Sequence, residues 1–212
     1  MGRRKKYENP EVVILDAAQE LFHRYGFHRT TLEDISKITS LGKASIYQCF
    51  ENKEAILLAV VGRSLTGLHQ RLQAIVQAQC NHSSSVLSES DWEALLKTIL
   101  FEEAWFKFQE VSAHFSGKDD FLLPPPIPPP KARQMFASWE AMFTGVLVEV
   151  LTYGVEQLNL QLSSTPENTA KSLRNAMVGF FPPVVLLRQL SPEAFKTELH
   201  QLLALLCKGI RR

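Results

Sequence analysis

The sequence predicts an all-α protein, in which a small N-terminal head of three helices precedes a larger helical bundle. Capping side chains recur before a proline and an acid, as in Asn9-Pro10-Glu11 and Thr165-Pro166-Glu167, and Ser191-Pro192 repeats the pattern. Proline at the first helical position loses no hydrogen bond, and the acid suits the positive end of the helix. Two further starts, Thr30-x-x-Glu33 and Ser90-x-x-Glu93, read as capping boxes. Apolar residues recur at helical spacing, and no stretch shows the period-two alternation of a half-buried strand.

The head is predicted from three closely spaced helical segments, about Pro10–Tyr25, Thr31–Ile38 and Lys43–Phe50. The residues expected to face inward are Ile14, Ala17, Ala18, Leu21, Phe22 and Tyr25 in the first, Leu32, Ile35 and Ile38 in the second, and Ile46 and Phe50 in the third. Leu41 would fill the turn between the second and third. Two short helices that share one apolar seam across a tight turn form a helix-turn-helix, whose second helix fits the major groove of DNA.

The segment ILDAAQELFHRYGFHRTTLEDISKITSLGKASIYQCFENKEAIL, roughly Ile14 to Leu57, resembles the DNA-binding domain of the TetR family of bacterial transcriptional regulators. The hallmark of that domain is an apolar helix followed by GF..TT...IA and K..LY.HF..KE.L. The resemblance implies a DNA-binding domain over residues 1–56, with the helix-turn-helix at about 31–50. It also implies a helical ligand-binding and dimerisation domain over residues 57–212.

The resemblance further implies which side chains contact double-stranded DNA. Thr31 would bond a phosphate through its hydroxyl and backbone N–H, while Gln48 and Ser45 would read base edges. Ala44 would allow close approach to a thymine methyl, and the lysines and Tyr47 would contact the backbone. The residues assigned to this interface are Thr31, Gly42, Lys43, Ala44, Ser45, Tyr47, Gln48 and Lys53.

The chain departs from the family pattern at three positions, which leaves a second interpretation open. Ser40 stands where the family has a turn glycine, Gly42 where it has a capping serine, and Cys49 where it has a histidine. A serine in the left-handed conformation would cost about 1 kcal/mol or more. The alternative is a helical interaction module that has lost operator binding and docks a partner through PPPIPPP, residues 124–130, or through an exposed face. That proline segment is otherwise expected to be a stiff, non-helical connector.

The C-terminal part of the chain predicts a homodimer. Leu202–Cys207 is apolar right round its helix, so it must be buried on more than one side. The preceding stretch Leu173–Leu190 is similarly apolar and is broken at Pro182-Pro183. The resemblance implies that the last two helices, about 166–190 and 192–210, form a four-helix dimer bundle. Such a dimer would read two half-sites about 34–36 Å apart.

Aromatic residues between the head and these helices predict an effector site. Aromatic side chains that converge between helices could line a pocket for a small apolar or aromatic molecule, although they could equally be plain core. The residues assigned to this pocket are Phe101, Trp105, Phe108, Trp139, Phe143 and Phe180. The polar residues able to orient a ligand are Glu102, Glu103, Gln109 and His114. Binding would shift the population toward a conformer whose recognition helices no longer match successive grooves.

Composition narrows the remaining functions. The net charge is only +1, although Arg3 to Lys6 form a basic tip that could lie along phosphates or remain a solvated terminus. Three widely spaced cysteines argue against a disulfide framework, and no signal peptide or membrane span is expected, so we predict a cytoplasmic protein. The six histidines form no HxxxH or HExxH pair and no phosphate-binding loop is present, so we predict no enzyme activity, no metal and no cofactor.

Overall fold

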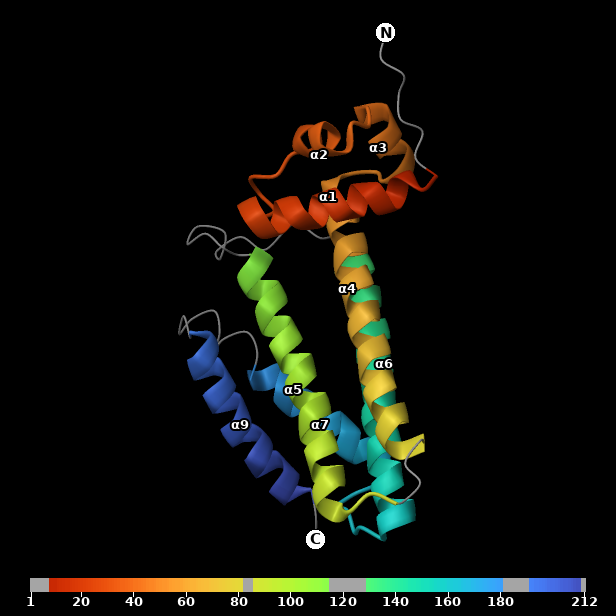
Figure 1. Cartoon of the computed structure of the whole chain (residues 1–212), viewed down its shortest axis with the longest axis vertical. Coiled ribbons are helices and arrows are strands. Elements are labelled where there is room, and N and C mark those ends of the chain that lie inside the picture. Colours follow the sequence, from red (N-terminus) through yellow and green to blue (C-terminus); the bar gives the residue numbers. More distant parts are fainter. Residues whose placement is uncertain (1–7, 82–85, 115–128, 181–190, 211–212) are drawn as a thin grey trace. The chain divides into compact units, whose positions relative to one another are not determined.

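The computed structural model describes residues 8–81, 86–114, 129–180 and 191–210, and every regular element in these ranges is helical (Figure 1). The elements are α1 (Pro10–Tyr25), α2 (Leu32–Thr39), α3 (Lys43–Cys49), α4 (Lys53–Val76), the π-helix η1 (Gln77–Asn81), α5 (Glu89–His114), α6 (Pro129–Leu158), α7 (Pro166–Phe180) and α9 (Pro192–Gly209). This confirms the all-α prediction. The chain divides into two compact units, residues 1–65 with 109–135 and residues 66–108 with 136–212.

Several helix starts lie where the capping signals predicted them. The Asn9 side chain accepts from the backbone N–H of Val12 with Pro10 in the first turn, and Asn52, Thr165 and Ser191 cap α4, α7 and α9 in the same way. These side chains satisfy N–H groups that have no partner within the helix.

Two predicted capping boxes lie in a different register from the one expected. At α2 the box is formed by Thr31 and Asp34, one residue beyond the predicted Thr30 and Glu33, because the Thr30 hydroxyl is buried and donates to Gly26 O at 2.8 Å. At α5 the cap is Ser88, whose hydroxyl accepts from the N–H of Asp91, so the predicted Ser90 already lies inside the helix.

The prediction that residues 124–130 cannot be helical is wrong for its last two residues. Pro129 and Pro130 occupy the start of α6. The first N–H groups of a helix have no partner within it, so two prolines are tolerated there. Residues 124–128 lie outside the described part of the chain.

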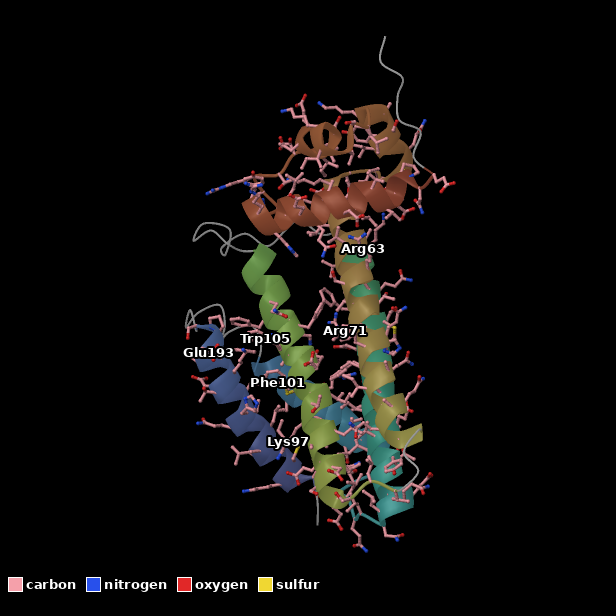
Figure 2. The ribbon with its side chains drawn as sticks, viewed as in Figure 1. Arg63, Arg71, Lys97, Phe101, Trp105 and Glu193 are labelled. Carbon is pink, nitrogen blue, oxygen red and sulfur yellow. The ribbon has the colours of Figure 1, made fainter. Side chains whose placement is uncertain are left out.

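The head has one continuous apolar core. Ile14, Ala18 and Phe22 of α1 are fully buried, and the cluster continues into α2, α3 and the first turns of α4. Arg63 of α4, labelled in Figure 2, donates to Asp16 Oδ1 at 2.7 Å and to Gln19 Oε1 at 2.6 Å on α1. The start of α4 is therefore fixed to the three short helices by apolar packing and by this forked polar contact.

The second unit packs around a buried tryptophan. The Trp92 side chain of α5 is fully buried, and its Nε1 donates to the carbonyl of Val150 on α6 at 2.7 Å. Gly154, one turn further along α6, leaves room for the indole, because a Cβ at this position would lie 2.7 Å from Trp92 Cε2. The close contact of α5 with α6 thus depends on a residue without a side chain.

The helix α6 is long and apolar enough over Arg133–Leu158 to cross a membrane, by length and composition alone. The sequence predicts no membrane span. Trp139, Phe143 and Leu147 of this helix are buried in the second unit. Core helices of globular proteins meet the same criterion, so this finding is weak support for a membrane span. The three cysteines, Cys49, Cys80 and Cys207, all lie in the described part of the chain, and none of them forms a disulfide.

We expect Gly154→Ala to destabilise the protein. Overpacking against the buried indole costs about 1–3 kcal/mol, which exceeds the gain of up to ~1 kcal/mol in helix propensity. The matched control is Gly145→Ala on the same helix, where a Cβ meets nothing within 4 Å and the substitution should stabilise. Urea denaturation of both variants measures the difference, and equal stabilities would contradict the packing assigned to Trp92.

Candidate nucleic-acid interface

A buried seam joins α2 to α3. Ile35 of α2 and Ile46 of α3 are both fully buried, and Phe50 after α3 is 8% exposed. Ile38 was predicted to belong to this seam, but its side chain is 50% exposed, and Thr39 is buried instead. The Thr39 hydroxyl donates to Ile35 O at 2.8 Å, so it needs no partner outside the helix. The inner face of α2 therefore runs through Ile35 and Thr39, and not through Ile38 as predicted.

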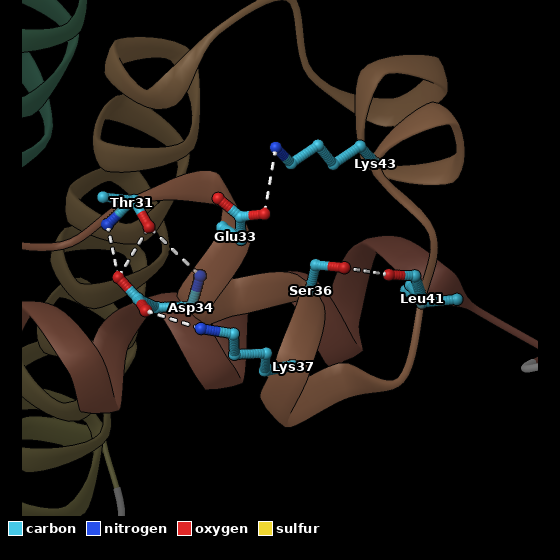
Figure 3. A network of polar contacts seen from close by, with 7 residues as sticks. All are labelled: Thr31, Glu33, Asp34, Ser36, Lys37, Leu41 and Lys43. Atoms are coloured by element: carbon cyan, nitrogen blue, oxygen red, sulfur yellow. Dashed lines mark hydrogen bonds and ion pairs between the residues drawn. The ribbon is translucent and has the colours of Figure 1, made fainter.

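The turn between α2 and α3 is held by two hydroxyl groups of α2. The Ser36 hydroxyl donates to the carbonyl of Leu41 at 2.6 Å (Figure 3). The N–H of Leu41 donates to the Thr39 hydroxyl at 3.3 Å. Ser40 has φ 56° and ψ 19°, the left-handed conformation that glycine usually supplies. Gly42 caps α3 without a side-chain hydrogen bond. The turn therefore keeps the geometry expected of a helix-turn-helix despite the unusual residue.

The short helix α3 presents one polar face to the solvent. Lys43, Ala44, Tyr47 and Gln48 are exposed, and Ser45 is half-buried. Tyr47 is 55% exposed although it is a large side chain. All five were assigned to the DNA interface from the sequence, and the structure brings them together on adjacent turns of one helix.

Thr31 lies at the N-terminus of α2, but its donors are already in use. Its backbone N–H donates to Asp34 Oδ2 at 3.0 Å and its hydroxyl to the same oxygen at 2.6 Å (Figure 3). The Thr31 side chain, followed by its backbone N–H, holds the pKa of Asp34 below the ordinary value. A phosphate at Thr31 would have to replace a carboxylate that carries the same charge.

An acidic residue also meets the first lysine of α3. Lys43 Nζ lies 3.4 Å from Glu33 Oε1, and both side chains are largely exposed (Figure 3). Exposed ion pairs of this kind are worth at most about 1 kcal/mol. Lys43 can therefore exchange Glu33 for another anion at little cost.

Lys53 occupies a different position from the one expected of a surface phosphate contact. Its Nζ donates to the carbonyls of Phe27 at 2.7 Å and Thr30 at 2.8 Å, and it lies 4.2 Å from the centre of the Phe27 ring. Burial lowers the pKa of Lys53, partly offset by Glu54. The structure thus gives this lysine a role that the sequence did not reveal, as a clamp between the start of α4 and the loop after α1.

The predicted effector residues fall into two groups. Phe101, Trp105 and Phe108 of α5 form a row of stacked rings that continues to Phe195 of α9, whose ring centre lies 4.4 Å from that of Phe108. Figure 2 shows Phe101 and Trp105 on neighbouring turns of α5. Lys196 lies 4.5 Å above the Trp105 ring.

The second group lies on α6. Trp139 and Phe143 stack with their ring centres 5.8 Å apart, and both are buried. The buried carboxylate of Glu103 belongs with this group, because the Trp139 side chain is one of the groups that lower its pKa. The side chains of Phe180 and His114 lie outside the described part of the structure.

The head defines the class of protein. Its three helices with a buried seam and an exposed polar helix form a helix-turn-helix of the DNA-binding type. The family model described as "Bacterial regulatory proteins, tetR family" matches residues 14–60. The segment 14–60 is therefore a DNA-binding domain of the TetR family of bacterial regulatory proteins. This family is not one of enzymes, which agrees with the prediction from the sequence.

Curated relatives match the same region. The HTH-type transcriptional regulator RutR of Escherichia coli is 38% identical over 52 residues, which are 24% of this chain and 24% of RutR. The negative regulator IcaR of the Staphylococcus epidermidis biofilm operon is 49% identical over 43 residues, 20% of this chain and 23% of IcaR. The alignments thus span about a quarter of each relative's length.

Solved structures match nearly the whole chain. A transcriptional regulator from Cytophaga hutchinsonii has a TM-score of 0.73 at 19% identity and covers 95% of this chain and 98% of its own. FadR from Bacillus subtilis, solved with stearoyl-CoA, has a TM-score of 0.64 at 16% identity and covers 94% and 99%. A regulator from Saccharomonospora viridis, solved with choline, has a TM-score of 0.66 at 16% identity and covers 96% and 98%. At these identities the likeness shows the fold alone.

We expect Lys53→Met to destabilise the head. Hydrogen bonds from a charged donor are worth about 1.5–3 kcal/mol, and the substitution leaves the Phe27 and Thr30 carbonyls without this donor. Lys43→Met, which removes an exposed lysine of the same head, should leave the free energy of unfolding nearly unchanged. Chemical denaturation compares the two variants. A Lys53→Met protein as stable as the parent would show that Lys53 does not stabilise the contact between α4 and the loop after α1.

Proposed function

We propose that the chain is a DNA-binding transcriptional regulator, which binds a palindromic operator as a dimer and is released from it by a small molecule. The observation that carries the proposal is the exposed polar face of α3, held outward by the fully buried Ile46 behind it. Repression is the direction we favour, since IcaR is a negative regulator. Binding to chromosomal DNA would place the protein in the cytoplasm.

The proposed contacts divide into positioning and reading. Lys43 and Tyr47 would contact phosphates, which fixes the register of α3 without reading sequence. Gln48 is exposed and could bond the edge of an adenine, and Ala44 could lie against a thymine methyl. Ser45, being half-buried, has less freedom to reach a base.

When DNA binds, phosphate groups would replace the two acids of α2 as partners of Lys43 and Thr31. Glu33 pairs with Lys43, and Asp34 occupies both donors of Thr31. A phosphate would have to displace at least one of these carboxylates, so part of the binding free energy is lost to the exchange. We infer that these acids lower affinity for DNA of every sequence.

The DNA interface is tested by selection from random duplexes, followed by binding measurements at several salt concentrations. Lys43→Ala should weaken all sequences similarly and reduce the salt dependence by about one phosphate contact, whereas Gln48→Ala should relax preference at one base pair by ~1–3 kcal/mol. Glu33→Gln should strengthen binding more than Glu11→Gln, which removes the same charge from the start of α1. If neither α3 substitution changes DNA binding, α3 is not the recognition helix, and a protein-interaction module becomes the better hypothesis for the function of this chain.

The proposed dimer uses the last helices, α7 and α9. Along α9, Phe195, Leu199, Leu203 and Cys207 are buried within the chain, while Leu205 on the opposite side is 69% exposed. Leu205 lies beside the half-buried Leu202 and Leu206. Together they give this side of α9 an apolar surface that is unusual for a helix face in contact with solvent. A second copy covering this face would also give the paired recognition helices that an operator requires.

We expect Leu205→Glu to convert the dimer into a monomer, because it places a charge in the proposed interface. Gln201→Glu, one turn earlier on the same exposed side, introduces the same charge where a polar side chain already stands. Sedimentation equilibrium measures the change. A Leu205→Glu protein that remains dimeric would exclude α9 as the interface.

The effector is proposed to bind in the helical body. Neighbours with the same fold were solved with stearoyl-CoA and with choline, so bodies of this architecture can hold ligands of very different chemistry. Both aromatic groups of the second unit could contribute apolar walls to such a site. Binding there would shift the population toward a form with lower operator affinity.

A further inference from the structure

The second unit contains an acidic residue whose charged form is destabilised by burial. Glu103 of α5 has a side chain only 1% exposed, and its neighbouring cation is Lys107, one turn later on the same helix. Within the described residues neither carboxylate oxygen accepts a hydrogen bond of good geometry. Burial raises the pKa of Glu103, although Lys107 and the Trp139 side chain act in the opposite direction. The carboxylate is therefore only partly compensated by the protein.

A role in stability does not explain this arrangement. Buried ion pairs are generally replaceable by apolar residues without loss of stability, because desolvation offsets the attraction between the charges. Lys107 is 24% exposed, and a flexible lysine side chain can carry its ammonium into water. The pair is therefore able to open on the Lys107 side while Glu103 stays buried.

The surroundings of Glu103 suit a particular kind of ligand. Trp139, 3% exposed, lies next to the carboxylate, and its ring stacks on the buried Phe143. A buried negative charge with aromatic rings close by is the combination that binds organic cations. A metal ion is a poor alternative, because no group of three or more His, Cys, Asp or Glu side chains is brought together among the described residues.

We propose that the effector is an organic cation, which replaces Lys107 as the counter-ion of Glu103 and lies against the ring of Trp139. The proposal rests on the proposed function only in placing effector binding in the helical body. It narrows the effector from an apolar or aromatic molecule to one that also carries a positive charge. Lys107 acts as a tethered competitor, which holds the site closed until the effector arrives.

The experiment compares two probes that differ in one atom. Phenyltrimethylammonium carries a quaternary nitrogen, and tert-butylbenzene has carbon in its place. Binding to the purified full-length protein, without DNA, is followed by tryptophan fluorescence and calorimetry. The parent protein should prefer the cation, and Glu103→Gln should lower cation affinity by at least about tenfold while leaving the neutral probe within about twofold.

The lysine substitution separates a binding site from a structural pair. Lys107→Met removes the competitor, so it should raise cation affinity. Glu103→Gln/Lys107→Met, which contains no buried charge and should fold, must bind the cation as weakly as Glu103→Gln alone. The control Glu102→Gln, at the neighbouring half-buried acid, should change neither probe. Circular dichroism and thermal melting confirm that each variant is folded.

The outcomes distinguish this inference from the proposed function. Cation binding that Glu103→Gln leaves unchanged, or the absence of cation binding in both the parent and Lys107→Met, overturns the inference. A protein that prefers the cation through Glu103 but binds no DNA supports the inference while contradicting the proposed regulator. A protein that binds DNA but shows no preference for the cation does the reverse.

Discussion

The burial of Ile35 against Ile46 is the constraint on which the head depends, because it fixes how α2 and α3 are rotated about their own axes. Side chains on a helix recur about every 3.6 residues, so a buried Ile46 places Gln48 on the opposite side of α3 and leaves Lys43 and Tyr47 on its flank. The same core extends through Ile56, Leu57 and Val60 of α4, so the rotation of the short helices is tied to the start of the long one. Apolar residues therefore determine which polar residues are presented, without any contact to a ligand.

The polar residues of the head then adjust what the core has positioned. Two lysines illustrate the difference: Lys43 is exposed and paired with an exposed acid, whereas Lys53 is bonded to two carbonyls and covered by Phe27. A motif match treats both as basic positions near DNA, but only one has a charge that is available without breaking the fold. The acids Glu33 and Asp34 work in the other direction, since they occupy donors that a phosphate would use. An affinity reduced in this way suits a protein whose operator complex has to be reversible.

Much of the head could be predicted from its sequence because strong local signals agreed there. Asn9-Pro10 gave the start of α1 correctly, since proline is tolerated at few helical positions. The start of α2 was misplaced by one residue, because Thr30 and Thr31 followed by Glu33 and Asp34 allow two equivalent boxes. Only tertiary burial of the Thr30 hydroxyl decides between them. The seam contains Thr39 and not Ile38, because Thr39 lies about one full turn after the buried Ile35 and its hydroxyl is satisfied by the Ile35 carbonyl.

The body was less predictable because its helices carry apolar residues on several sides. Aromatic density suggested a single pocket, but successive residues of α5 point in directions about 100° apart. Phe101 and Trp105 therefore share one face of the helix, whereas Glu103 lies about 200° from Phe101. The sequence indicates these faces but not which helix covers each of them. Without knowing the covering helix, an aromatic ring that fills the core cannot be distinguished from one that lines a ligand site. Glu103 shows how charge helps where hydrophobicity does not. A buried apolar side chain requires only space and close packing, whereas a buried carboxylate also requires a partner, so its surroundings restrict the possible ligands far more than the rings do.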